Sequence, residues 1–175
     1  MIVKLALFAI GSLGIVRFSW PWLRNPRAHG FYRFFAFELL LALFLLNAGD
    51  WFREPFSPRQ LAAWTLLFAS LALAIHGFYL LRVIGQPKGD FEQTTTLVTV
   101  GAYKYIRHPL YASLLLLDWG IFLKHVSLLT LVLAVLITAF LTATAAVEEA
   151  ENAAKFGADY REYIKTSKRF IPFLF

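Results

Sequence analysis

Five apolar runs separated by short polar segments constrain the fold of this chain more than any other feature. The runs cover residues 2–20, 31–48, 61–81, 109–123 and 126–147. A helix needs about 20 mostly apolar residues to cross the hydrocarbon core of a bilayer, and every run except residues 109–123 is close to that length. The sequence therefore predicts an all-α, polytopic membrane protein with about five transmembrane helices.

The composition agrees with this fold class and excludes several functions. Of the 175 residues, 59% are hydrophobic and 17% aromatic, which is above the range of soluble globular proteins. The net charge of +6 lies in short clusters between the apolar runs, so the lipid bilayer is the expected partner and nucleic acid is not. There is no cysteine, and the four histidines lack a metal-ligand spacing, so no metal site is expected.

The chain reads as a single integral membrane domain over residues 1–175. Residues 1–84 hold three spans, and residues 85–175 hold a polar loop, a helical hairpin and an amphipathic tail. We interpret the first run as an uncleaved span, because its apolar stretch up to Val16 is followed by Arg17 and Trp20 and not by a small-residue cleavage pattern.

The positions of Lys and Arg predict the orientation, since positive residues beside the spans gather on the cytoplasmic side. Thirteen fall on one side of the five spans and four on the other. We expect the N-terminus outside and the long loop and C-terminus in the cytoplasm, and the compact length suggests a bacterial or archaeal inner membrane. The thirteen are Arg17, Arg24, Arg27, Arg33, Arg82, Lys88, Lys104, Arg107, Lys155, Arg161, Lys165, Lys168 and Arg169.

Residues 109–123 and 126–147 are predicted to form a helical hairpin with a tight turn at Lys124-His125. The first helix would be about 22 Å long at about 1.5 Å per residue, short of the ~30 Å hydrocarbon core. It should be tilted or enclosed by protein. In the tail, Phe156, Tyr160 and Tyr163 recur at helical spacing, which suits either a cover over a cofactor or a plain interfacial anchor.

Residues 101–111 are a polar, aromatic and cationic segment at the start of the hairpin. Pro109 favours the first helical position, so His108 would precede a helix whose unpaired N–H groups, with Arg107, suit a carboxylate or phosphate. The alternative is that Arg107 anchors the protein at the membrane surface and Tyr103 and Tyr111 belong to an interfacial belt.

A pair of acids, Glu148 and Glu149, stands at the end of the second hairpin helix. Two carboxylates there oppose the helix dipole and repel each other, so they require a cationic or hydroxyl-rich partner. An antiparallel hairpin brings them beside the anion site at His108. The residues alone therefore suggest a pocket for a zwitterionic cofactor or an amphipathic ligand.

The second half of the chain resembles the isoprenylcysteine carboxyl methyltransferase family, which shares its hairpin with phospholipid N-methyltransferases. The resemblance covers about residues 92–172, and the first three spans are similar to the family only as hydrophobic helices. It rests on Leu97, Val98, Thr99, Gly101, Tyr103, residues 107–111, Glu148, Glu149, Phe156, Gly157, Tyr160, Tyr163 and residues 169–172.

The resemblance implies a membrane-embedded methyltransferase that uses S-adenosylmethionine and methylates a lipophilic acceptor. In role, His108 and the helix start would meet the methionine carboxylate, Tyr103 and Tyr111 would wall the sulfonium and adenosine, and Glu148 would take a hydroxyl or ammonium. Arg169 and Glu149 are the candidate catalytic residues. The implied cofactor contacts are Thr95, Thr96, Leu97, Val98, Tyr103, His108, Pro109, Leu110, Tyr111 and Glu148.

Two positions depart from the family pattern. Ser113 replaces a usual glycine, and Thr144 stands where the prenylcysteine enzymes carry an arginine that engages the substrate. A neutral side chain cannot pair with a carboxylate, so an amine or thiol acceptor is favoured, unless Arg169 reaches in from the tail. The alternative class is a non-catalytic membrane protein that keeps the hairpin for ligand binding or as a scaffold.

Three ionisable residues lie inside the spans: Glu38, His76 and Asp118. Because ionisable side chains are costly to bury in a membrane, each is a candidate functional residue. Each could line a tunnel for the acceptor or be a satisfied structural residue.

Overall fold

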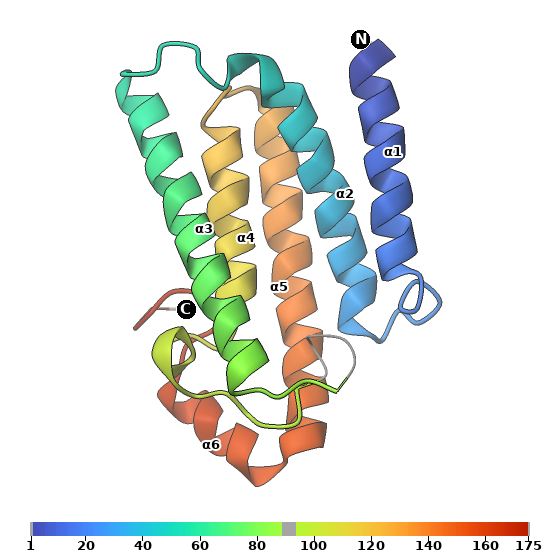
Figure 1. Ribbon diagram of the computed structural model, residues 1–175, viewed down its shortest axis with the longest axis vertical. Coiled ribbons are helices and arrows are strands. Elements are labelled where there is room, and N and C mark those ends of the chain that lie inside the picture. The colour runs from blue at the N-terminus through green and yellow to red at the C-terminus, as the bar shows by residue number, and fades with distance from the viewer. Residues whose placement is uncertain (1, 89–93, 175) are drawn as a thin grey trace.

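A computed structural model describes residues 2–88 and 94–174, and that part of the chain is helical without a strand (Figure 1). The predicted all-α class is therefore confirmed. The helices are α1 (Ile2–Ser19), α2 (His29–Asn47), α3 (Pro58–Val83), α4 (Pro109–Phe122), α5 (Leu128–Phe156) and α6 (Ala158–Thr166), with two short 3₁₀ helices, η1 (Ala48–Asp50) and η2 (Gly101–Lys104).

Four helices in the described residues are long and apolar enough to cross a membrane: α1, α2 continued by η1, α3 and α5. The 14-residue α4 is shorter. α4 packs against α3, α5 and α2 and buries more than half of its residues, among them Tyr111, Asp118 and Ile121. The short helix is therefore enclosed by protein, which is one of the two arrangements expected for it.

The ends of the long helices follow from local sequence signals. Ser57 caps α3 by accepting a hydrogen bond from the Gln60 N–H, with Pro58 at the first helical position. Ser127 and Thr130 form a reciprocal capping box at the start of α5. At the other end α5 continues past the predicted limit at Val147 and stops before Gly157, whose φ of 59° breaks the helix.

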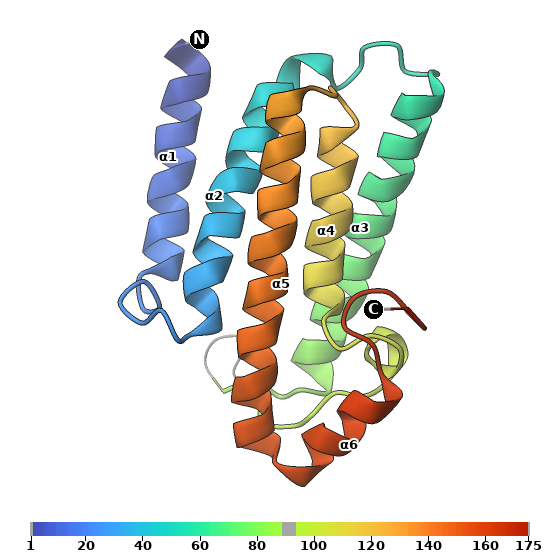
Figure 2. The same cartoon turned by 180° about the vertical axis from the view of Figure 1, so that it is seen from behind.

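The bundle is arranged so that α3 packs along α4, and α2 packs along α5 (Figures 1 and 2). These two contacts are more extensive than the contact between α4 and α5 themselves. α1 packs against α2 and leaves most of its apolar side chains exposed. The N-terminus lies at one end of the bundle, and α6 with the loop and tail at the other.

The end of the bundle that lacks α6 is closed by a buried polar cluster. The Lys124 Nζ donates to Gln60 Oε1 at 3.0 Å and lies 3.6 Å from the centroid of the Trp64 ring. Asn47 donates to the Ile121 carbonyl at 2.8 Å. These contacts tie α2 to the last turn of α4, and α3 to the turn that follows it.

The three ionisable residues predicted inside the spans have structural partners. Ser12 donates to Glu38, which links α1 to α2, and Thr138 donates to Asp118 across the α4–α5 contact. The His76 ring accepts a hydrogen bond from the Ala102 N–H and so holds η2 against α3. None of the three lines the cavity described below.

Candidate functional site

A cavity of about 290 Å³ lies at the α6 end of the bundle. All helices except the 3₁₀ helix η1 contribute to its wall, together with the segment 94–98. Seven of the ten predicted cofactor contacts line it: Leu97, Val98, Tyr103, His108, Leu110, Tyr111 and Glu148. The hairpin helices and the loop before them thus meet at one chamber.

The other three predicted contacts lie beside the cavity. The Thr95 N–H donates to the Gly85 carbonyl and its hydroxyl to the Gln86 carbonyl, which fastens the loop to the end of α3. Thr96 donates to Gly85 as well. Pro109 occupies the first position of α4, and Thr94, which was not among the predicted contacts, lines the wall.

The two predicted anchors meet across the α4–α5 contact. The Tyr111 hydroxyl donates to Glu148 Oε2 at 2.5 Å, and His108 Nδ1 lies 3.9 Å from Glu148 Oε1. The His108 ring stacks on the Tyr111 ring with 5.5 Å between centroids. A carboxylate is thereby fixed at the cavity wall, where it can accept a hydroxyl or ammonium donor.

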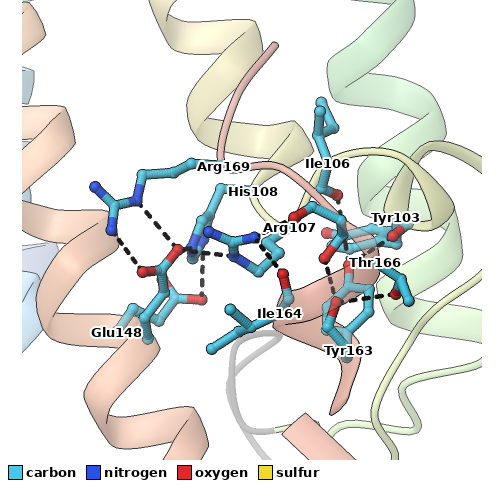
Figure 3. A network of polar contacts seen from close by, with 11 residues as sticks. Tyr103, Ile106, Arg107, His108, Glu148, Tyr163, Ile164, Thr166 and Arg169 are labelled. Atoms are coloured by element: carbon cyan, nitrogen blue, oxygen red, sulfur yellow. Dashed lines mark hydrogen bonds and ion pairs between the residues drawn. The ribbon is translucent and has the colours of Figure 1, made fainter. Parts of the chain in front are cut away.

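Glu149 does not line the cavity, and its carboxylate accepts hydrogen bonds from two arginines. Arg169 donates to both carboxylate oxygens at 3.1 and 2.6 Å, and Arg107 Nε donates to Oε1 at 2.9 Å. His108 Nε2 lies 3.3 Å from the same oxygen. Glu149 and Arg169, the predicted catalytic pair, are therefore neighbours, and neither lines the cavity. Figure 3 shows the side chains of Arg107, His108 and Arg169 close together.

The tail is held against the hairpin by further hydrogen bonds. Arg107 donates through Nη1 to the Ser167 carbonyl, and the Tyr163 hydroxyl donates to the Tyr103 carbonyl at 2.6 Å (Figure 3). Ile106 and Lys168 form an isolated parallel bridge. Tyr160 and Tyr163 of α6 line the cavity, which fits the covering segment, one of the two interpretations of the amphipathic pattern.

The phenols around the site stay protonated near neutral pH. Burial raises the pKa of Tyr160 to about 12, helped by the nearby Glu149 carboxylate. Burial also raises the pKa of Tyr103 and of Tyr163 well above the usual range. These groups can act as hydrogen-bond donors but not as proton acceptors in this pH range.

Arg33 is the main site residue that the sequence analysis missed. The sequence analysis counted Arg33 among the charges on the cytoplasmic side. In the structure Arg33 is only 2% exposed and lines the cavity from α2. Its position inside an apolar run was the available signal, because charge within a span marks function by default. Asn152 and Phe156 also line the cavity, because α5 is longer than predicted.

Residues 2–88 and 94–174 contain no group of three His, Cys, Asp or Glu side chains that could hold a metal ion. Residues 58–159 match the family model described as Phospholipid methyltransferase. The matched region runs from the start of α3 into the first turn of α6, more than half of the chain. No curated protein and no solved structure gives a significant match.

Proposed function

This chain belongs to the phospholipid methyltransferase family, and we propose that it transfers a methyl group from S-adenosylmethionine to a lipophilic or amphipathic acceptor in the membrane. The observation that carries the proposal is the convergence of His108, Tyr111 and Glu148 on one cavity beneath α6. A membrane scaffold has no need for a fixed carboxylate in a chamber lined by aromatic side chains.

The residues present fit the proposed cofactor. The cavity volume of about 290 Å³ is near the lower end of the range for small-molecule sites, roughly 300–1,000 Å³. Its wall combines aromatic side chains (Tyr103, Phe156, Tyr160) for an adenine ring with one carboxylate, Glu148, for the ribose hydroxyls or the ammonium. The bound cofactor would supply a methyl group on a sulfonium, which is transferred with its bonding pair left on sulfur.

The role of the protein in such a displacement is to align the reactants and exclude water. Tyr111 fixes the Glu148 carboxylate by a hydrogen bond, and α6 closes the chamber from the side of the tail. We assign Glu149 and Arg169 to positioning in place of catalysis, because their contacts hold the tail to the hairpin.

The test is calorimetric binding of S-adenosylmethionine to detergent-purified protein. A hydrogen bond to a charged group contributes about 1.5–3 kcal/mol, so Glu148→Gln should weaken binding by roughly ten- to a hundredfold while the protein stays folded. Glu162→Gln, on the exposed face of α6, is the matched control and should bind as the wild type does. Unchanged affinity in Glu148→Gln would contradict the assigned role.

The reaction itself is tested by transfer of a labelled methyl group into a total membrane lipid extract. Identification of the labelled product would show whether nitrogen, oxygen or sulfur is methylated. Binding of S-adenosylmethionine without any transfer would favour a ligand-binding protein over an enzyme.

A further inference from the structure

Arg33 is a buried cation at the wall of the cavity. It lies one turn into α2, and its residue is 2% exposed. Its guanidinium carbon is 5.1 Å from the ring centroids of Phe18 and Trp22 and 5.7 Å from that of Phe37. Three aromatic rings from three segments therefore hold the guanidinium in place by cation–π contacts.

The part of the cavity beyond Arg33 is apolar and extends away from the tail. Phe18 and Phe37 line it together with Arg33, and so do Ala74 in the middle of α3 and Leu114 on the second turn of α4. The opposite part is lined by Tyr103, Tyr160 and Tyr163 near α6. Arg33, which is also hydrogen-bonded to Tyr111, thus lies where the apolar side of the cavity meets the site formed by Tyr111 and Glu148.

Position 144 provides no cation for this side of the cavity. Thr144 is fully buried, and its hydroxyl donates to the Phe140 carbonyl at 2.7 Å within α5. It does not line the cavity. Any anionic group that enters the apolar side must therefore be recognised from another helix, and Arg33 lines that side from α2.

We propose that Arg33 recognises an anionic oxygen group of the acceptor, a phosphate or a carboxylate, at or next to the methylated atom. The planar fork of a guanidinium matches both groups in a bidentate arrangement. The apolar chain of the acceptor would lie along Phe37, Ala74 and Leu114, and its reacting end would face Glu148. The inference rests on the proposed function, and it reopens the acidic acceptors that Thr144 argued against.

The test uses dodecyl phosphate and dodecanoate as probes, with equilibrium binding measured in a neutral detergent. Both are compared for the wild type, Arg33→Gln, Arg33→Lys and the control Arg82→Gln. Arg82 also lies over an aromatic ring, Phe78, at the same end of the bundle, but it does not line the cavity. Calorimetry of S-adenosylmethionine is run on the same preparations.

Arg33→Gln should bind the preferred anionic probe at least tenfold more weakly, and Arg33→Lys should fall between Arg33→Gln and the wild type. Arg82→Gln should match the wild type. Affinity for S-adenosylmethionine should stay within twofold in Arg82→Gln. In Arg33→Gln it should fall less than the affinity for the anionic probe, because the contact of Arg33 with the cofactor site is only through Tyr111. The probe that binds wild type more tightly identifies phosphate or carboxylate as the recognised group.

Equal probe affinities in wild type and Arg33→Gln would overturn the inference, and so would a loss confined to S-adenosylmethionine, which would place Arg33 in the cofactor site. If Arg33→Gln does not fold, Arg33→Lys decides, because it must still bind the preferred anionic probe more weakly than the wild type does. Wild type that binds S-adenosylmethionine but neither probe refutes only this inference. Wild type that does not bind S-adenosylmethionine refutes the proposed function.

Discussion

Glu149→Gln should release the tail from the hairpin without unfolding the bundle. The Glu149 carboxylate is the common partner of Arg107 and Arg169, so it joins the segment before α4, the last turns of α5 and the tail after α6. The side chains of Glu149 and Arg107 are 13% and 10% exposed, and that of Arg169 is 25% exposed. The three side chains are therefore mostly shielded from solvent.

The magnitude follows from this burial. Removing one partner of a buried ion pair costs about 3–5 kcal/mol, but Arg169 is partly solvated and a glutamine oxygen still accepts one hydrogen bond, so about 2–3 kcal/mol is expected here. Because about 1.36 kcal/mol corresponds to a factor of ten, the population with an undocked tail should rise roughly 30- to 160-fold.

Limited proteolysis with a protease specific for Lys and Arg measures this population, since Lys165 and Lys168 lie in the tail. Cleavage follows the open fraction when opening and closing are fast compared with cutting. Glu162→Gln is the matched control, because Glu162 pairs with Lys165 at the surface with its side chain 70% exposed, and exposed pairs contribute at most about 1 kcal/mol. Similar cleavage rates for the two variants would refute the reasoning.

Three further outcomes are expected. Tyr111→Phe removes the hydrogen bond to Glu148 and should weaken S-adenosylmethionine binding about tenfold in calorimetry, because a bond to a charged group contributes about 1.5–3 kcal/mol. The pKa of Tyr160 is about 12 in the docked tail and about 10 in an unfolded chain, so the docked state retains a proton that the free tail loses. Tail cleavage should therefore accelerate as pH rises from about 10 to about 12. The acceleration should be smaller in Tyr160→Phe and the same as that of the wild type in Tyr105→Phe. Lys124→Ala, at the far end of the bundle, should lower the free energy of unfolding by about 2–4 kcal/mol in detergent denaturation and leave cofactor affinity unchanged.

The membrane fold could be predicted from sequence because lipid imposes a simple rule on length and polarity. The four long helices and the enclosed short helix follow from the apolar runs and their Ser, Pro and Gly boundaries. The end of α5 could not be placed by polarity. The residues after Val147 are mostly polar, yet they continue the helix, because no helix breaker occurs before Gly157.

The separate positions of Glu148 and Glu149 could not be read from the sequence. Neighbouring residues of a helix differ by about 100° in direction, so only one of the two can face the cavity. That one is Glu148, while Glu149 faces the tail. The pattern showed that the pair needed cationic or hydroxyl partners, but the choice depends on the rotation of α5, which packing against α2 and α4 fixes.

Arg33 shows a different limit. Charge counts beside the spans treat every arginine alike, but the environment of Arg33 is made by Phe18 and Trp22, which lie on α1 and the segment after it. Their approach depends on how α1 packs on α2, and α1 has almost no hydrophobic asymmetry in its sequence from which that face could be inferred.

The shortness of α4 sets the depth at which the acceptor is met. The start of α4 is level with Glu148, as the Tyr111 contact shows, and α5 continues for eight more residues to Phe156, about 12 Å at 1.5 Å per residue. The chamber is therefore a recess sunk below the rim of the protein. Pulling one sixteen-carbon chain out of lipid takes about 12 kcal/mol at about 0.8 kcal/mol per CH₂. An acceptor of the proposed kind that reached the recess sideways, with its chain still immersed in lipid, would avoid that desorption barrier.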